Sequence, residues 1–349
     1  MKYNRKTIII IFFIIELGMI LPFAFQMTKE FFKKDKDEFL TLLKQYENIL
    51  VKNGIIRHSK NLTTRIKFLI SAKVISNSVF DGKDKWLFYS SKNDGHLIND
   101  YKGKNYPSKL ELEEMKNNFI SNFAFLKNRG IKFIVFVAPN KGKIYSRYFP
   151  DNFIIATKTT TDYVVEQMQS SKFDFPVIYP YKEMLEYSQK YQLYYPRDTH
   201  WNQLGAYIGF RTLLKEGFNY DLPMLDSLRI KEEQSKVKGD LVNMVKLDNY
   251  YPYLTEYSIK EYDDIQTTSN KDYDNPNPLI NKSVLVIGDS FSEGLKKYLI
   301  KTFAKVSIVF RKDYDIDKFE KFKPDVVIFE SVGRLFYQKE HTHFSLEKK

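Results

Sequence analysis

The turn that carries Ser290 constrains the fold more than any other part of the sequence. The run Ser283-Val-Leu-Val-Ile287 is apolar without interruption, as in a strand that is buried on both faces. Gly288-Asp289-Ser290 follows, and a helix is expected to begin near Glu293. A strand that turns sharply into a helix lifts the serine hydroxyl to the carboxyl edge of the sheet, where open α/β folds bind ligands. Ser290 is therefore a candidate nucleophile, although a serine at this position also suits a plain N-cap.

The rest of the chain alternates between strand and helix patterns. Unbroken apolar runs and helical spacing predict strands at 132–138, 176–181, 306–310 and 325–329, helices at 108–128, 164–169 and 204–216, and a short β-like patch at 79–89. This alternation predicts an α/β domain of three layers, with a parallel sheet covered by helices on both faces. We assign the domain to residues 73–349, with a polar, tyrosine-rich insertion at about 222–278.

The amino-acid composition excludes several kinds of functional site. The 349 residues include no cysteine, which excludes disulfides, zinc sites built on thiolates and a cysteine nucleophile. The formal net charge is +12, but the lysines are interspersed with acidic residues and form no basic stripe with interleaved aromatics. We therefore expect no nucleic-acid partner. The charge reflects either a compositional bias or attraction to an anionic cell-surface polymer or to lipid headgroups.

The N-terminus resembles a membrane anchor. Lys2, Arg5 and Lys6 precede an apolar run from Thr7 to Gln26, which is long enough for one membrane span with its basic flank in the cytoplasm. We predict a cytoplasmic flank and signal-anchor helix at 1–27, a helical stalk at 28–72, and a catalytic domain held outside the cytoplasm at the cell membrane. A cleaved signal peptide is the alternative.

His200 is the histidine best placed for catalysis. Asp198-Thr199-His200-Trp201-Asn202 precedes an apolar helix, whereas the other four histidines lie in polar segments or in the C-terminal tail. An aspartate two residues before a histidine can accept the Nδ1–H from within a turn and fix the tautomer that takes a proton from serine. The sequence therefore predicts a triad of Ser290, His200 and Asp198, and we predict no metal site.

These blocks resemble a known family. Gly-Asp-Ser and Asp-x-His on an α/β pattern resemble SGNH-type acyl hydrolases, but with the histidine block upstream. That permuted order, with DTHWN before GDSFS, is similar to the alginate O-acetyltransferase family and its DHHW relatives. Further stretches agree with that family. They are Gly82-Lys-Asp-Lys-Trp-Leu-Phe88, Val137-Ala-Pro-Asn-Lys141, Lys238-Gly-Asp-Leu241 and Pro324-Asp-Val-Val-Ile328.

The resemblance implies an O-acetyltransferase that acts through an acetyl-Ser290 intermediate. His200 would be the general base and acid, and Asp198 the carboxylate that orients it. The acceptor would be a secreted or cell-surface polysaccharide, and a polytopic membrane O-acyltransferase would deliver the acetyl group, so that no separate cofactor is implied. An acetylesterase with the same triad and a non-catalytic membrane scaffold remain alternatives, because no residue decides whether sugar or water attacks the acyl-enzyme.

The pocket around the triad is less well determined. The strand after the nucleophile ends at Phe310-Arg-Lys312 without the usual glycine, and the last strand ends at Phe329-Glu-Ser331 without the usual asparagine. The oxyanion donors beyond the Ser290 amide are therefore unassigned. Candidates for substrate or oxyanion binding are polar or aromatic residues near strand ends and the triad: Asn140, Lys141, Trp201, Arg311, Ser331 and Arg334.

Overall fold

The computed structural model describes residues 76–90, 96–265 and 272–342, together with Phe68, Val74, Ser345 and Leu346. The predicted signal-anchor helix at 1–27 lies outside these residues, as does the predicted stalk at 28–72 apart from Phe68. Among the helices of the described part, none combines the length and the hydropathy that a membrane span requires.

A six-stranded sheet forms the centre of the domain, in the order β4-β3-β10-β8-β9-β7. Its strands are β3 (Lys132–Ala138), β4 (Val177–Ile178), β7 (Asp272–Asp274), β8 (Ile280–Gly288), β9 (Phe303–Phe310) and β10 (Val326–Val332). Five of them run parallel, but β7 pairs antiparallel with β9. The prediction of a wholly parallel sheet is therefore corrected to a mixed, mostly parallel one. The link from β7 to β8 is too short for the crossover that a parallel connection needs.

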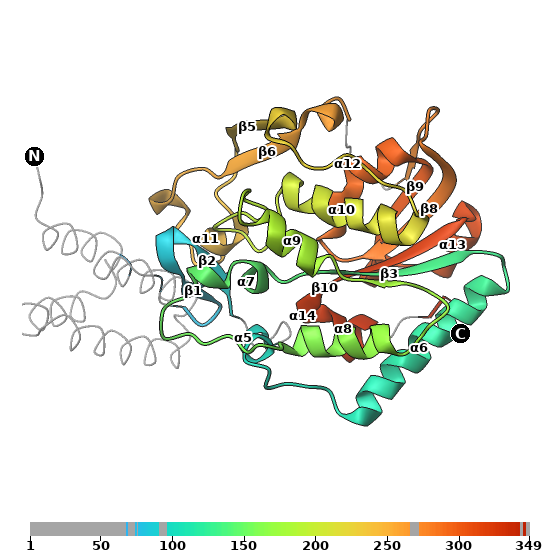
Figure 1. Ribbon diagram of the computed structural model, residues 1–349, viewed down its shortest axis with the longest axis horizontal. Helices are drawn as coiled ribbons and strands as arrows, with labels where there is room; N and C mark the ends of the chain where they lie inside the picture. The colour runs from blue at the N-terminus through green and yellow to red at the C-terminus, as the bar shows by residue number, and fades with distance from the viewer. Residues whose placement is uncertain are drawn as a thin grey trace, which may run out of the picture.

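Both faces of the sheet are buried, which explains the unbroken apolar runs of its strands. Ile134 and Val286 face one core, while Val135 and Leu285 face the other. Helices α9, α10 and α12 cover the first face, and α6 and α8 lie on the opposite side (Figure 1) with α13. The bounds are α6 Lys109–Lys127, α8 Thr160–Ser170, α9 Tyr181–Tyr187, α10 Gln203–Phe218, α12 Ser292–Thr302 and α13 Ile316–Phe322. The three predicted layers are thus present.

The start of α6 shows how local sequence fixes an element. The Ser108 hydroxyl accepts the Glu111 N–H, and the Glu111 carboxylate accepts the Ser108 N–H at 2.7 Å. This capping box satisfies two amides that would otherwise lack partners. The predicted helix at 108–128 therefore begins directly after Ser108, as its sequence predicts.

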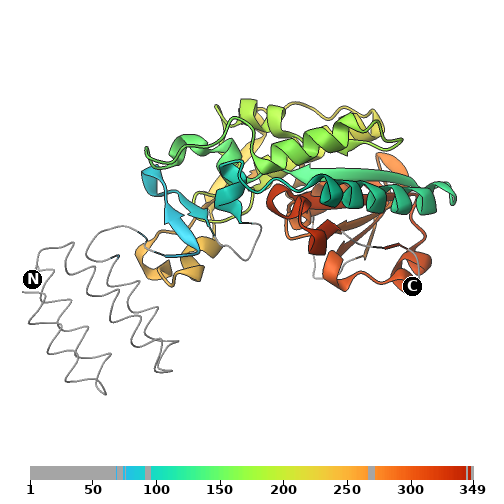
Figure 2. The ribbon, with the colours of Figure 1, turned by 90° about the horizontal axis from the view of Figure 1, so that it is seen from below.

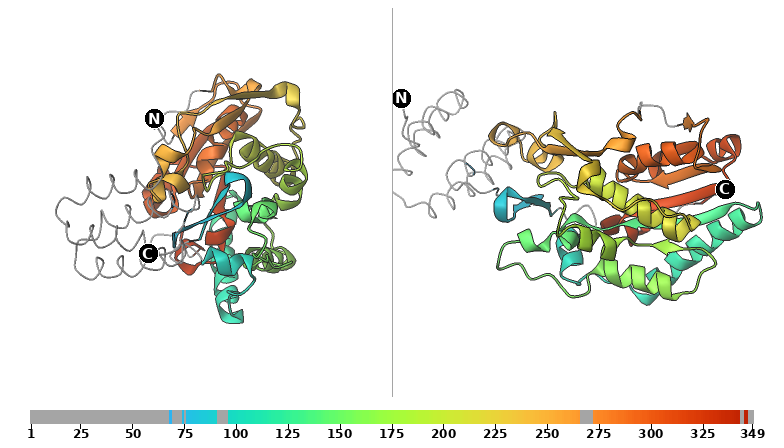
Figure 3. Two further views of the ribbon diagram at one scale, coloured as in Figure 1. Left: turned by 90° about the vertical axis from the view of Figure 1, so that its left-hand side faces the viewer. Right: turned by 45° about the horizontal axis from the view of Figure 1, so that its top comes forward.

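The described residues of the insertion form three short strands, where its sequence predicts one or two. Besides β7, it includes β5 (Ile230–Gln234) and β6 (Thr255–Ile259), which pair antiparallel, and the short helix α11 (Asp240–Met244). The β5–β6 pair lies beside α10 and α12 (Figure 3), where the Tyr262 ring packs against two tyrosines of those helices.

A small hairpin completes the domain. Strands β1 (Val79–Asp81) and β2 (Leu87–Tyr89) pair antiparallel within the predicted β-like patch. The hairpin lies beside α11 of the insertion (Figure 2), and Leu87 and Leu241 share one apolar cluster there.

Helices begin where three strands end. Helix α7 (Lys141–Ile144) follows β3, α12 follows β8, and α14 (Gly333–Phe336) follows β10. Helices α5 (Leu97–Tyr101) and α15 (Lys339–Thr342) complete the described helices with more than three residues. Because β3, β8 and β10 are parallel neighbours, the turns that follow them meet at one edge of the sheet.

Candidate active site

Ser290 lies in the turn between β8 and α12 and is exposed to solvent. The amides on either side of it have partners: the Asp289 N–H donates to Glu330 Oε2 at 2.9 Å, and the Phe291 N–H donates to Asp289 Oδ1 at 2.9 Å. None of the described residues accepts a hydrogen bond from the Ser290 amide. The turn thus presents a hydroxyl and an amide together, as an acyl-transfer site requires.

His200 lies in the loop between α9 and α10. A β-bridge between Tyr194 and Trp201 closes this loop, and the Asn202 side chain caps α10 by accepting the Gly205 N–H. At the tip, Asp198 Oδ1 accepts the backbone N–H of His200 at 3.0 Å, an Asx turn within the Asp-x-His block. The spacing of that block therefore shapes the turn as well as the side-chain contact.

The two segments bring the three predicted residues together. His200 Nε2 lies 2.7 Å from Ser290 Oγ, and His200 Nδ1 lies 2.7 Å from Asp198 Oδ1. An Nδ1–H donated to Asp198 leaves Nε2 free to accept the serine proton. Burial raises the pKa of Asp198, but the hydrogen bonds and the charge of His200, with the amide of Asp240, outweigh burial and hold that pKa below its usual value.

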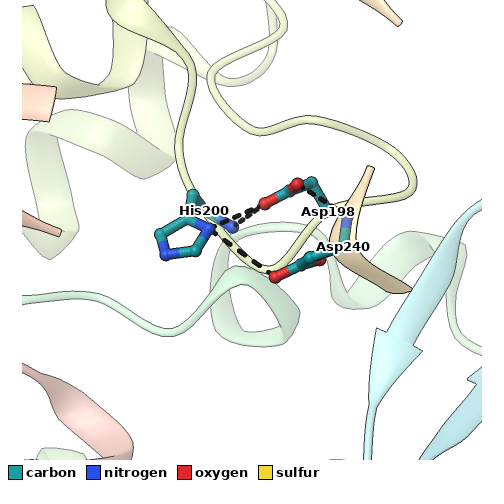
Figure 4. Close-up of side chains that lie close together, drawn as sticks. All are labelled: Asp198, His200 and Asp240. Carbon is teal, nitrogen blue, oxygen red and sulfur yellow. Dashed lines mark hydrogen bonds and ion pairs between the residues drawn. The ribbon is translucent and has the colours of Figure 1, made fainter. Parts of the chain in front are cut away.

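Asp240, the first residue of α11 in the insertion, is a second carboxylate at the site. Its oxygens accept the Thr199 N–H at 2.8 Å and the Thr199 hydroxyl at 2.5 Å, while its own N–H donates to Asp198 Oδ2 at 2.8 Å. Figure 4 shows both carboxylates on the Nδ1 side of the His200 ring, with Asp240 Oδ2 at 3.7 Å. Burial, followed by repulsion from Asp198, raises the pKa of Asp240.

Gly239 allows Asp240 to reach the loop. A Cβ at this position would lie 2.1 Å from the Arg197 carbonyl oxygen, and the backbone φ is +110°. Only glycine fits this close approach without strain. The family-like stretch Lys238-Gly-Asp-Leu241 was the signal that could have identified Asp240 from the sequence.

Asp198, His200 and Asp240 also have the donor types of a metal site. One ligand atom from each lies within 4.8 Å of the others. Those atoms are, however, engaged within the protein, because Asp198 Oδ1 holds His200 Nδ1 and Asp240 Oδ2 accepts the Thr199 hydroxyl. Asp198, His200 and Asp240 are thus joined by hydrogen bonds to one another or to Thr199.

Lys141 lies behind the histidine loop. Its buried ammonium donates to the carbonyl oxygens of Leu87, Pro196 and Asp198 at 2.7, 2.9 and 2.9 Å. Burial lowers the pKa of Lys141 to about 7, and Asp198 is the strongest of the charges that oppose this fall. All three donors of the ammonium are thus used to join β2 to the loop that carries Asp198.

Asn140 and Arg334 belong to an adjoining network. Asn140 donates to Asp100 Oδ2 at 3.0 Å and accepts the Arg334 N–H at 3.0 Å. The Arg334 guanidinium lies 5.7 Å from the centre of the Phe291 ring, one residue after the predicted nucleophile. Arg334, Asn140, Lys141 and Thr199 line a cavity of about 10 Å³, which is room for about one water molecule.

Trp201 and Ser331 lie inside the protein. The Trp201 side chain is 3% exposed, donates to the Phe291 carbonyl at 3.2 Å and packs against the Phe291 ring. Trp201 supports the turn that carries Ser290 from inside the core, as is usual for a tryptophan at the start of an apolar helix, and it presents no face to a substrate. Ser331 is fully buried in β10, and its hydroxyl donates to the neighbouring Val332 carbonyl.

Arg311 directly follows β9 and lies next to the turn that carries Ser290. It donates to the Glu330 carbonyl oxygen at 2.6 Å and lies 3.3 Å from Asp289 Oδ2. The structure therefore places Arg311 against the turn, with its guanidinium directed to groups of the protein.

A three-layer α/β domain with serine, histidine and aspartate joined at the carboxyl edge of its sheet defines the SGNH-like class. The family model for the SGNH hydrolase-like domain of the acetyltransferase AlgX matches residues 79–311. The chain belongs to this family of acetyltransferase domains. No curated protein sequence matches the chain.

Solved structures share the fold at low sequence identity. Bacillus cereus PatB1, solved with a sulfonyl adduct, aligns with a TM-score of 0.53 and 16% identity over 74% of this chain and 96% of its own. A DHHW family protein from Eubacterium siraeum aligns with a TM-score of 0.54 and 13% identity over 79% of this chain and 98% of its own. Nearly the whole of each relative is thus represented in this chain.

Proposed function

We propose that the chain transfers an acetyl group through Ser290 to a hydroxyl of a secreted or cell-surface polysaccharide. The observation that carries the proposal is the continuous hydrogen-bonded path from Ser290 Oγ through His200 to Asp198, with 2.7 Å at both steps. Membership of an acetyltransferase family supports acetyl as the group transferred. The resemblance to alginate O-acetyltransferases supports a polysaccharide as the acceptor.

In the first half-reaction, Ser290 Oγ attacks the carbonyl carbon of the acetyl donor. His200 Nε2 takes the hydroxyl proton and returns it to the leaving group, so that acetyl-Ser290 forms as the bond from acetyl to donor breaks. Asp198 stabilises the imidazolium that forms in between. The Ser290 amide supplies one donor for the oxyanion, and removal of one such donor typically costs about 10²–10³-fold in rate.

In the second half-reaction, a sugar hydroxyl attacks the acetyl carbon. His200 Nε2 takes the proton of that hydroxyl, and the proton then goes to Ser290 Oγ as the serine leaves. Because Ser290 is exposed, a chain as bulky as a polysaccharide can approach it without entering a deep pocket. Arg334 adjoins the turn from the neighbouring strand end, and we assign it to the acceptor side of the site.

Membrane attachment belongs to the same proposal and rests on sequence. The apolar run from Thr7 to Gln26 would anchor the chain with its N-terminus in the cytoplasm and its catalytic domain outside. A polytopic membrane O-acyltransferase would then supply the acetyl group at the membrane surface.

The test uses the full-length chain in detergent with 4-nitrophenyl acetate as donor, and cellotetraose or tetragalacturonate as acceptor. Mass spectrometry should find an acetyl adduct that is absent from Ser290→Ala and that passes to an oligosaccharide. Preference for tetragalacturonate over cellotetraose would indicate that the net positive charge of the chain serves to attract an anionic polymer. Release of acetate at a rate indifferent to both sugars would instead make the protein an esterase, and the absence of adduct and turnover would exclude both enzymes.

A further inference from the structure

Three polar residues lie directly against the turn that carries Ser290. Asp289 belongs to the turn itself, Arg311 follows the last residue of β9, and Glu330 lies within β10. These two strands flank β8 on either side. The turn is therefore held between polar groups from both neighbouring strands.

The Asp289 carboxylate accepts hydrogen bonds from three segments. Oδ1 accepts the Phe291 N–H of the turn at 2.9 Å, and Oδ2 accepts the Val332 N–H at the end of β10 at 2.8 Å. The Arg311 guanidinium reaches Oδ2 at 3.3 Å from the other side. One carboxylate thus joins the ends of three adjacent strands, with Ser290 between two of the bonded residues.

Arg311 and Glu330 make the remaining hydrogen bonds of this group of residues. Arg311 donates to the Glu330 carbonyl oxygen at 2.6 Å, and Glu330 Oε2 accepts the Asp289 N–H at 2.9 Å. A Cβ at Gly288 would lie 2.5 Å from Glu330 Oε2, so that the glycine of the motif makes room for this carboxyl. The Gly-Asp-Ser sequence and Glu330 are therefore fitted to each other.

The charges in this group balance. The side chains of Asp289 and Arg311 are only 11% and 10% exposed and form an ion pair. The Glu330 side chain is fully buried, and burial followed by the charge of Asp289 raises its pKa well above the usual value. A neutral Glu330 beside one ion pair leaves no unbalanced charge beneath the nucleophile.

We propose that Arg311 and Glu330 are positioning residues for Ser290, which clamp the nucleophile turn by holding Asp289 from both neighbouring strands. The inference rests on the proposed function, in which Ser290 is the nucleophile. It also accounts for the two strand ends that depart from the SGNH pattern. Their side chains bond to the turn, so these positions fix the serine in place of supplying oxyanion donors.

The experiment measures acetylation of Ser290 in the full-length chain by stopped flow with excess 4-nitrophenyl acetate. The burst rate constant reports how fast a competent site reacts, and the burst amplitude reports how many sites are competent. The variants are Arg311→Met, Arg311→Lys, Glu330→Leu and Glu330→Gln. The matched control is Glu320→Gln, an exposed glutamate of α13.

Arg311→Met and Glu330→Leu should lower the burst rate constant by about 10- to 100-fold, because a displacement of about 1 Å can cost about 10²-fold. Their amplitudes should stay close to that of wild type. Glu330→Gln, which keeps the shape of a neutral acid, should recover most of the loss, and Arg311→Lys should recover part of it.

Wild-type rate constants in Arg311→Met and Glu330→Leu would overturn the proposed clamp. Reduced amplitudes at an unchanged rate constant would also overturn it, because they would indicate that the two residues have a purely structural role. If Glu330→Leu fails to fold by circular dichroism, Arg311→Met decides alone. Failure of the proposed function is distinguishable, since wild type would then show no burst, or Ser290→Ala would retain one.

Discussion

The two halves of the active site are held in different ways. The Ser290 half is fixed by the ends of adjacent strands within one sheet, through Asp289 and its bonds to β9 and β10. The His200 half is a loop held by groups from distant segments: Lys141 after β3 and Asp240 from the insertion. The turn that carries Ser290 is therefore anchored to the central sheet, whereas His200 depends on segments that must dock correctly onto the domain.

The supporting carboxylates of the two halves also differ in exposure. The side chain of Asp240 is 28% exposed, whereas Glu330 beneath the turn of Ser290 is fully buried. Electrostatic interactions near the surface are screened by salt more than buried ones. The His200 half should thus respond more to charge changes and pH, and the Ser290 half more to changes in packing.

Asp198→Asn should have the largest effect in the His200 half. An asparagine can present its NH₂ group to His200 Nδ1 and so favour the wrong tautomer. The acetylation rate constant should fall roughly 10⁴-fold. Stopped-flow bursts with 4-nitrophenyl acetate measure it, and a loss smaller than tenfold would contradict the role of Asp198.

Asp240→Asn should cost less, because it keeps the backbone bond to Asp198 and removes only the carboxylate charge and one of the two acceptors for Thr199. We expect a reduction of about 10- to 100-fold in the same rate constant, as for a slightly displaced base. Asp264→Asn is the control, since Asp264 lies in the same insertion with a side chain that is 74% exposed. Equal acetylation rate constants for Asp240→Asn and Asp264→Asn would show that Asp240 has no role in the site.

Lys141→Met should act on stability in a pH-dependent way. The folded pKa of about 7 lies below the ordinary value of 10.5, so the unfolded chain binds more protons between these pH values. The stability that wild type gains from this group is therefore full above pH 10.5 and lost as pH falls to 7. The unfolding free energy of wild type minus that of Lys141→Met should rise with pH by at most about 1.4 kcal/mol per unit.

Urea denaturation between pH 7 and pH 9.5 measures this difference. The exposed Lys236→Met serves as the control and should follow wild type across the range. Parallel pH curves for wild type and Lys141→Met would show that burial does not lower the pKa of Lys141.

Tyr195→Phe should have the smallest effect on catalysis. The Tyr195 hydroxyl donates to Glu256 of β6 at 2.6–2.7 Å, a contact between the loop and the insertion that does not reach the triad. Loss of a hydrogen bond to a charged group should lower the unfolding free energy by about 1.5–3 kcal/mol. Thermal and urea unfolding measure this loss. A burst rate constant that falls as far as in Asp240→Asn would show that the whole insertion, and not Asp240 in particular, positions the base.

The elements of the core could be predicted because their signals are local. The strand at 132–138 has the bounds of the apolar run that predicted it, and the Ser108 capping box starts the predicted helix. The insertion could not be predicted in detail, because its weak periodicity does not indicate where β7 joins the sheet. The contacts that join Ser290, His200 and Asp198 agree with the prediction from Asp-x-His and Gly-Asp-Ser, since each block forms its own turn.

Most roles of the supporting residues could not be assigned from sequence, because they depend on tertiary contacts. Only the family-like stretch Lys238-Gly-Asp-Leu241 indicated Asp240. Lys141 was expected to bind substrate or the oxyanion, and its ammonium donates to three carbonyl groups of the protein. Asp240 is 40 residues from His200 along the chain, and only the approach permitted by Gly239 brings it there. Such contacts join segments that are far apart along the chain, and no sequence pattern indicates that these segments meet.

The central claim is that Ser290 is acylated by a base that Asp198 holds in place. Rapid-quench peptide mapping after mixing with 4-nitrophenyl acetate tests it most directly. We predict one acetyl group on the peptide containing Ser290 in wild type, and almost none in Asp198→Asn at the same time point. Acetyl found only on other residues, or on Ser290 at equal levels in both proteins, would contradict the account.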